Sequence, residues 1–159
     1  MSAGLELREE PFDSPVAQQL IAAVQAEYVV RYGGPDEAPI DATEFMPPHG
    51  LFLVGYLGTE PVATGGLRRH AGNADGGGID VELKRMYVVP EARGKGLSRV
   101  MLSALEERAR GMGASRIVLE TGNRQPEAVS LYESSGYERI EGFGYYAGAP
   151  LSISFGKKL

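Results

Sequence analysis

The chain has 159 residues, of which 43% are hydrophobic and 23% are charged, with a formal net charge of −5 and no cysteine. This length and composition fit a single globular domain, 1–159, that can bury a substantial core. They exclude disulfides and thiol chemistry, and the acidic balance argues against a general nucleic-acid-binding protein. The N-terminus lacks a signal peptide and no run approaches membrane-spanning length, so we expect a cytoplasmic protein with no membrane partner.

The first half of the chain predicts a strand, a helix, a long loop and a β-hairpin. Ser14 followed by Pro15 marks the start of the helix and Gly33 ends it, because serine caps a helix N-terminus and proline fits its first turn. The long loop is acidic and proline-bearing, which suits either a binding element or an ordinary surface loop. In chain order these elements are strand 5–9, the helix between Ser14 and Gly33, loop 35–50, and hairpin strands 51–57 and 62–68, followed by a glycine-rich connection at 71–78.

The strand after the glycine-rich connection changes phase in its middle. Val81 and Leu83 alternate with polar residues, and so do Met86 and Val88, but the two pairs are out of phase by one residue. A β-bulge at Arg85 and the residue before it would return both pairs to one face, since a bulge inserts one extra residue. The alternative is a strand without a bulge, with Arg85 lying across the surface.

The second half of the chain predicts two further helices, each followed by strands. Leu97, Met101 and Leu105 recur at helical spacing and predict a buried face, with Glu106 on the outward face. The order of elements suits an α/β (α+β) domain with a mixed, mostly antiparallel sheet of about six to seven strands and helices on both faces. These elements are strand 79–89, helix 97–112, strand 116–121, helix 125–135, and the antiparallel strands 137–140 and 151–155.

A glycine-rich turn, Arg93-Gly94-Lys95-Gly96-Leu97-Ser98, opens helix 97–112. Glycine lets backbone N–H groups approach a ligand closely, and the free N–H groups of a helix's first turn favour anions, phosphate above all. Arg93 and Lys95 add positive charge at the rim. A Walker A loop would need glycine at position 89 and a dinucleotide fingerprint would need it at position 99, and these positions hold Val89 and Arg99.

Five motifs together resemble those of the GNAT superfamily of N-acetyltransferases in order and spacing. The glycine turn is similar to the family's Arg/Gln-x-x-Gly-x-Gly/Ala pyrophosphate loop and departs from it only at Ser98. The resemblance covers about residues 50–141 and implies the acyl-CoA N-acyltransferase fold with a bulged central strand. The motifs are Glu82-Leu83-Lys84-Arg85-Met86-Tyr87-Val88, Pro90-Glu91, Arg93-Gly94-Lys95-Gly96, Leu119-Glu120-Thr121-Gly122 and Leu131-Tyr132-x-x-x-Gly136-Tyr137.

This resemblance implies acetyl-CoA as co-substrate and no metal. In the family the bulged strand splays from its neighbour, and the pantetheine arm lies in the gap against exposed backbone groups. The N–H groups of the glycine turn would hold the pyrophosphate. Asn123 stands where members often place a polar contact to the cofactor arm, and it equally suits a turn after Gly122. The cofactor-binding residues so implied are Met86, Tyr87, Val88, Arg93, Gly94, Lys95, Gly96, Leu97, Ser98 and Asn123.

The resemblance also implies two catalytic residues. Glu82 stands where many members hold a general base, and burial would raise a carboxylate's pKa from about 4.3 toward neutrality. Its structural alternative is an ion pair with Lys84 or Arg68, and Glu120 is the second candidate for the base. Tyr132 matches the tyrosine that donates a hydrogen bond or proton to the CoA sulfur, and its alternative is a core tyrosine.

The implied reaction is acetyl transfer from acetyl-CoA to a primary amine of a small molecule or peptide, by direct attack in a ternary complex. The alternative is a catalytically silent acetyl-CoA-binding sensor or interaction module. Amino acids, polyamines, aminoglycosides and protein N-termini all remain open as acceptors. Many members pair as homodimers through sheet edges or C-terminal strands, for which residues 151–155 would serve. The residues nominated for the acceptor side are Tyr28, Tyr32, Glu44, His49, Tyr145 and Tyr146.

Overall fold

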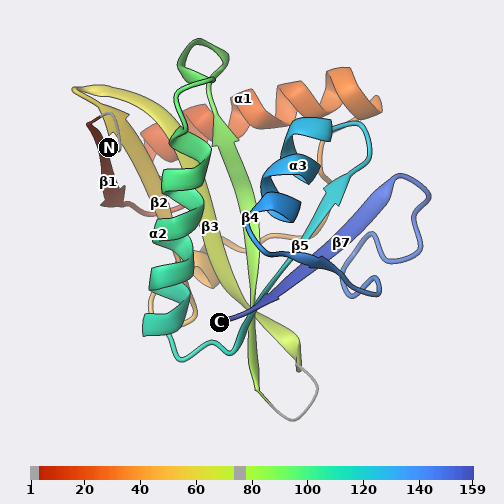
Figure 1. Ribbon diagram of the computed structural model, residues 1–159. Coiled ribbons are helices and arrows are strands. Elements are labelled where there is room, and N and C mark those ends of the chain that lie inside the picture. The colour runs from red at the N-terminus through yellow and green to blue at the C-terminus, as the bar shows by residue number, and fades with distance from the viewer. Residues whose placement is uncertain (1–3, 74–77) are drawn as a thin grey trace.

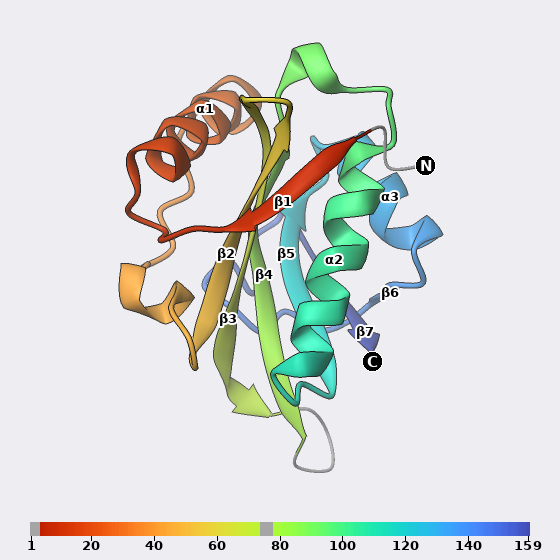
Figure 2. The ribbon, with the colours of Figure 1, turned by 90° about the vertical axis from the view of Figure 1, so that its left-hand side faces the viewer.

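A twisted sheet forms the centre of the molecule, with α1 on one face and α2 and α3 on the other (Figures 1 and 2). The computed structural model describes residues 4–73 and 78–159. Within these residues the sheet has seven strands in the order β1-β2-β3-β4-β5-β7-β6, and only the β4–β5 pair is parallel. The predicted mixed, mostly antiparallel sheet is therefore confirmed. The elements are β1 Leu5–Glu9, α1 Pro15–Tyr32, the 3₁₀ turn η1 Ala42–Phe45, β2 Gly50–Leu57, β3 Glu60–Asn73, β4 Ile79–Val88, the 3₁₀ turn η2 Pro90–Ala92, α2 Leu97–Gly111, β5 Arg116–Gly122, α3 Pro126–Ser134, β6 Glu138–Arg139 and β7 Ser152–Lys158.

Local sequence signals account for both ends of α1. The Ser14 hydroxyl accepts a hydrogen bond from the Ala17 N–H at 3.1 Å, and Pro15 occupies the first turn. At the other end Gly33 has a φ of 82°, and its N–H donates to the Val29 carbonyl at 2.9 Å. A serine cap and a left-handed glycine satisfy backbone groups that the helix itself cannot.

The β2–β3 hairpin turns more tightly than the sequence predicts. β3 begins at Glu60 rather than at residue 62, and it continues to Asn73, which pairs with Ile79 of β4. The predicted glycine-rich connection at 71–78 is therefore partly strand, and its residues 74–77 lie outside the described part of the chain.

Two apolar clusters hold the helices on the sheet. The larger lies between the sheet and α2 and α3, and Met101, Leu105 and Ile117 are fully buried in it. The smaller lies beneath α1, where the Phe12 and Phe45 rings stack with centroids 4.7 Å apart. Burial of apolar surface is the main favourable term in folding, so these clusters fix how the helices sit on the sheet.

The prediction that Glu106 of α2 faces outward is wrong, because its side chain is buried. The Tyr137 hydroxyl donates to Glu106 Oε2 at 2.9 Å, and the Lys157 ammonium lies 3.2 Å from the same oxygen. A buried carboxylate is tolerated when it is paired and hydrogen-bonded. Glu106 thus ties α2 to the C-terminal strands.

Residues 151–155, which were nominated for a dimer contact, lie inside the sheet over part of their length. β7 pairs with β5 on one side, and Phe155 and Gly156 pair with β6 on the other. Among the described helices, none combines the length and the apolar character needed to cross a membrane.

Candidate active site

The centre of the site is a gap that opens between the parallel strands β4 and β5. The two strands pair only at Asp80–Arg116, Val81–Ile117 and Glu82–Val118. Beyond Glu82 they diverge, as Figure 1 shows.

The predicted β-bulge is present at the start of this gap. Arg85 and Met86 of β4 lie opposite the single residue Gly65 of β3, and Arg85 has a φ of 57°. The Thr64 hydroxyl donates to the Arg85 carbonyl at 2.7 Å and holds the bulge from inside the sheet. A bulge interrupts the ladder and redirects side chains, which is why bulges often lie beside active sites.

Beyond the bulge, the backbone of β4 offers hydrogen-bonding groups to the gap. The Val89 N–H donates to the Val62 carbonyl of β3 at 2.9 Å. Because successive residues of a strand direct their backbone groups to opposite edges, Tyr87 faces β3, whereas Met86 and Val88 face the gap. Tyr87, implied as a cofactor contact by resemblance, therefore has its backbone turned to the neighbouring strand.

The glycine turn has the geometry of an anion site. Gly94 and Gly96 have φ values of 79° and 76°, and a Cβ built on either would meet nothing within 4 Å. Arg93 does not point freely outward, because its Nε donates to the Val88 carbonyl at 2.9 Å and its NH2 to Glu27 at 2.7 Å. The turn is thus held against β4 and α1 while its glycine backbone stays open to solvent.

The first turn of α2 follows directly after the glycine turn, whose Gly96 is the N-cap of the helix. No side chain of the described residues caps this helix, Leu97 is buried and Ser98 is half-buried. Uncapped N–H groups at the positive end of a helix dipole fit a phosphate, so this turn suits a phosphate group. Lys95 is exposed beside it, and Asn123 is exposed after β5, with its backbone N–H bonded to Leu151.

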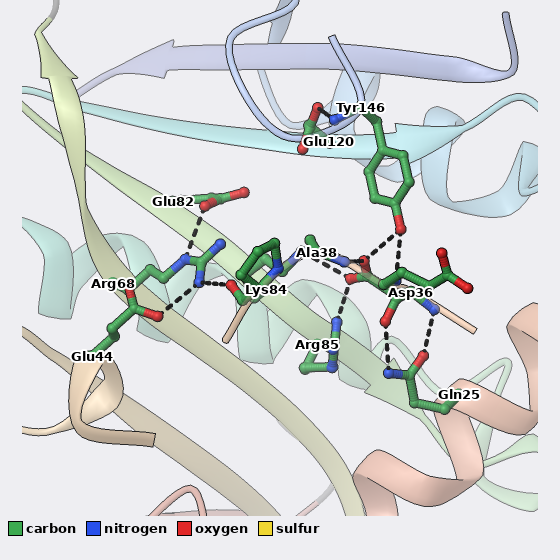
Figure 3. A network of polar contacts seen from close by, with 12 residues as sticks. Gln25, Asp36, Ala38, Glu44, Arg68, Glu82, Lys84, Arg85, Glu120 and Tyr146 are labelled. Atoms are coloured by element: carbon green, nitrogen blue, oxygen red, sulfur yellow. Dashed lines mark hydrogen bonds and ion pairs between the residues drawn. The ribbon is translucent and has the colours of Figure 1, made fainter. Parts of the chain in front are cut away.

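On the α1 face of the sheet, one carboxylate holds two buried cations. Asp36 Oδ2 accepts from the Lys84 ammonium at 2.8 Å and from the Arg85 guanidinium at 2.6 Å (Figure 3). Lys84 and Arg85 are 8% and 6% exposed. Burial alone would raise the pKa of Asp36, but the charges of Lys84 and Arg85 outweigh it and hold that pKa well below its ordinary value.

Asp36 also joins three chain segments. Its Oδ1 accepts from the Tyr146 hydroxyl at 2.8 Å and from the Ala38 N–H at 2.9 Å. Its backbone N–H donates to Gln25 of α1 at 2.7 Å. Burial and the hydrogen bond to Asp36 raise the pKa of Tyr146 to about 12, so this phenol remains a donor at neutral pH. The loop after α1 and the C-terminal loop are therefore anchored to the bulge through one side chain.

Glu82 lies in the adjoining ion-pair group and is 3% exposed. Arg68 Nε donates to Glu82 at 3.0 Å, while its NH1 donates to Glu44 at 3.0 Å and to the Pro39 carbonyl at 2.9 Å. Of the two cations considered as partners for Glu82, the structure selects Arg68, because Lys84 is bonded to Asp36.

Glu120 of β5 is placed differently. Its Oε2 accepts from the Tyr146 backbone N–H at 3.0 Å, while its Oε1 is buried with no hydrogen-bond partner among the described residues. A Cβ built on Gly144 would lie 2.5 Å from Oε1, so glycine is needed where the C-terminal loop covers this carboxylate. Burial raises the pKa of Glu120, the Tyr146 N–H opposes the rise, and the Glu82 charge adds to it.

Tyr132 is buried on α3, with its ring 5.5 Å from that of Tyr137 and 6.0 Å from that of Phe155. Burial raises its pKa, and the neighbouring Tyr28 adds to the rise. Burial also raises the pKa of Tyr28 to about 12, although the Arg85 charge opposes it.

The residues nominated for the acceptor side are not all brought together. Tyr146 and Glu44 join the networks of Figure 3, and Tyr145 is exposed with its ring 4.9 Å from that of Tyr146. Tyr32 instead donates to Gln125 at 3.1 Å, between α1 and the start of α3. His49 is exposed at the start of β2.

The sequence did not single out Asp36, Arg85 or Gln25 as site residues. Asp36 was only one residue of the long acidic loop, and Arg85 was named only for the phase slip and as part of the motif of residues 82–88. The available signal was two consecutive cations, Lys84 and Arg85, inside a predicted central strand, since buried cations require anions nearby. In the part of the chain that the structure describes, no group of three or more His, Cys, Asp or Glu residues is placed to hold a metal ion.

Comparison with known proteins agrees with this geometry. Residues 17–137 match the acetyltransferase (GNAT) family. An uncharacterized N-acetyltransferase from Escherichia coli, YjgM, is 34% identical over 136 residues, covering 81% of this chain and 78% of its own. An IAA acetyltransferase from Azospirillum brasilense is 33% identical over 152 residues, covering 96% of this chain and 95% of its own.

Solved structures share the fold over the whole chain. A candidate acyl-CoA N-acyltransferase from Klebsiella pneumoniae aligns with a TM-score of 0.79 at 27% identity, covering 99% of both chains. A GNAT acetyltransferase from Elizabethkingia anophelis, solved with acetyl-CoA bound, aligns with a TM-score of 0.67 at 12% identity, covering 98% of this chain and 99% of that one. With the bulged and splayed strands and the glycine turn already in place, these matches establish that the chain belongs to the GNAT acetyltransferase family and is an acyltransferase.

Proposed function

We propose that this protein is an acetyl-CoA-dependent N-acetyltransferase that transfers the acetyl group directly to a primary amine of a small molecule. The observation that carries the proposal is the presence of Glu120, a half-buried carboxylate whose Oε1 is buried and unpartnered among the described residues, on the strand that borders the β4–β5 gap. An amine that attacks a thioester must give up a proton, and a carboxylate of raised pKa is suited to accept it at neutral pH.

Acetyl-CoA supplies a thioester, a carbonyl carbon activated toward attack. On the protein side, the N–H groups from Gly94 to Ser98 hold its pyrophosphate at the N-terminus of α2. The backbone of Met86 and Val88 pairs with the pantetheine arm in the gap. Lys95 adds charge at the rim, and Asn123 lies at the far side of the gap, after β5.

We assign the general base to Glu120 rather than to Glu82. Glu82 is held by Arg68, whereas Oε1 of Glu120 has a lone pair free for the proton of the amine. Glu82 acts on the base through its charge, which raises the pKa of Glu120. Arg68, which pairs with both Glu82 and Glu44, fixes the position of that charge.

Tyr132 assists the departure of the thiolate. The new C–N bond forms as the C–S bond breaks, Glu120 takes the proton of the amine, and the thiolate leaves with the electron pair of the C–S bond while Tyr132 donates a hydrogen bond to its sulfur. Because burial raises the pKa of Tyr132, the phenol keeps its proton and acts as a hydrogen-bond donor rather than as an acid. Because a thiol ionises near pH 8.5, the thiolate is a fair leaving group unaided, and Tyr132 assists rather than controls the step.

A thiol-release assay with acetyl-CoA and a panel of amines tests the proposal, together with a thermal-shift titration of acetyl-CoA. We expect stabilisation by acetyl-CoA and thiol release with at least one class of amine. Stabilisation without release on every amine would refute the enzyme assignment and favour a silent acetyl-CoA sensor. Absence of stabilisation would refute the cofactor site itself.

Two matched variants identify the base. Glu120→Gln should lower kcat by about 10²-fold or more and abolish the acid limb of the pH–rate profile, with the acetyl-CoA thermal shift retained. Glu82→Gln should keep the acid limb but move it to lower pH, because it removes a negative charge that raises the pKa of Glu120. Loss of the limb in Glu82→Gln, with the limb retained in Glu120→Gln, would reverse the assignment.

A further inference from the structure

Two buried polar atoms stand out because they have no partner. Among the described residues, the buried side-chain nitrogen and oxygen atoms without a hydrogen bond are Arg85 Nε and Glu120 Oε1. One is a donor and the other is an acceptor. Both belong to the group of polar side chains in Figure 3, where Tyr146 and Asp36 lie between them.

One end of the Arg85 guanidinium is hydrogen-bonded, whereas its Nε is buried without a partner among the described residues. Its NH1 donates to Asp36 at 2.6 Å, and Lys84 donates to the same carboxylate oxygen, so two cations share one anionic oxygen. A buried donor that lacks an acceptor costs free energy, and a guanidinium binds carboxylates through two parallel N–H groups. The Nε edge of Arg85 is therefore suited to a second carboxylate.

Arg85 lies beside the gap in which the reaction is proposed to take place. It forms the β4 bulge, just beyond the point at which the pairing of β4 with β5 ends. Glu120 lies across the same group of side chains, joined to Asp36 through the backbone and the hydroxyl of Tyr146. A single acceptor that extends across this group would meet a carboxylate at one end and a guanidinium at the other.

We propose that the acceptor carries a free carboxylate as well as its amine, so that the substrate class is the amino acids. Arg85 binds the carboxylate through its Nε edge, while Glu120 receives the amine. Asp36 is a positioning residue that orients the guanidinium from the opposite end. This inference rests on the proposed acetyltransferase function, and it disfavours polyamines and aminoglycosides, which have no carboxylate.

The first test compares substrates that differ only in the carboxylate. Purified protein is assayed for thiol release with L-lysine against 1,5-diaminopentane, and with L-phenylalanine against 2-phenylethylamine and L-phenylalaninamide. For the pair that is turned over, we expect kcat/KM to be about tenfold or more higher with the carboxylate, the value of a charge-assisted hydrogen bond. Equal or faster turnover of the amines that lack a carboxylate would overturn the proposal.

Variants then assign the preference to Arg85. Arg85→Gln, and Arg85→Lys as a variant that keeps the buried charge, should both bring the kcat/KM ratio close to one. Arg110→Gln changes an exposed arginine that pairs only loosely with Glu107, and it should keep the wild-type ratio. An unchanged ratio in Arg85→Lys would overturn the subsite, whether or not that variant keeps the acetyl-CoA thermal shift.

A binding measurement separates this inference from the proposed function. Thermal shifts are recorded for the amino acid of the preferred pair and for its carboxylate-free partner, in the absence of acetyl-CoA. If the amino acid alone stabilises the wild type but not Arg85→Lys, while no thiol is released, the subsite stands and the transferase proposal fails. If thiol is released but neither compound is distinguished, the transferase proposal stands and the subsite fails.

Discussion

Replacing Asp36 with asparagine removes the carboxylate charge that pairs with both Lys84 and Arg85, and it leaves the size of the side chain nearly unchanged. The side chains of Asp36, Lys84 and Arg85 are 12%, 8% and 4% exposed, so solvent screens these ion pairs little. Removing one partner of a buried pair costs about 3–5 kcal/mol, because the other charge stays buried without compensation. We expect about 3 kcal/mol for Asp36→Asn, since the amide can still accept from the Ala38 N–H.

Urea denaturation followed by far-ultraviolet circular dichroism measures this loss. With a slope of about 2 kcal/mol per molar urea for a domain of this size, the midpoint should fall by about 1.5 M. Asp13→Asn is the matched control, because Asp13 is exposed just before α1, and its effect should stay within about 0.5 kcal/mol. A loss below about 1 kcal/mol for Asp36→Asn would refute the reasoning, since the two cations would then be solvated or neutral.

The pH dependence of the same variant follows from the lowered pKa of Asp36. A carboxylate whose pKa is lower in the folded state contributes its full stabilisation above the unfolded value, about 3.9, and loses it as the pH falls further. The stability difference between wild type and Asp36→Asn should therefore be constant from about pH 5 to pH 7 and shrink below about pH 4. A difference that grows on acidification would contradict the assigned direction of the shift.

Substitutions of Gly96 and Gly144 give further predictions. Gly96→Glu should abolish the acetyl-CoA thermal shift, because Gly96 adjoins the proposed pyrophosphate site. Gly58→Glu is the control: Gly58 also has a positive φ and open surroundings, so this variant should lose similar stability but keep the thermal shift. Equal acetyl-CoA binding by both variants would contradict the assignment. Gly144→Ala should displace the Glu120 carboxylate, since the added Cβ would lie 2.5 Å from Oε1. We expect a loss of kcat of about tenfold or more with acetyl-CoA binding retained, and an unchanged kcat would argue against Glu120 as the base.

Much of the fold follows from patterns that act over a few residues. Ser14 and Gly33 marked the ends of α1 because caps satisfy backbone groups within one turn. The phase slip around Arg85 located the bulge, since side chains of a strand alternate with a period of two and one inserted residue reverses the pattern. The glycine turn marked the start of α2 for the same local reason.

The chemical environment of the site depended on contacts that no local pattern contains. Asp36 meets Lys84 and Arg85 from 48 and 49 residues away, and Tyr146 meets Asp36 across 110 residues. Glu106 lies inside rather than outside because Tyr137 and Lys157 arrive from the far end of the chain to pair with it. The sequence by itself determined both ends of α1 and where β4 bulges, and it predicted where phosphate would bind. Only the tertiary structure decided which carboxylates are neutralised and which retains a free oxygen, because the burial and pairing of a charge depend on the whole fold.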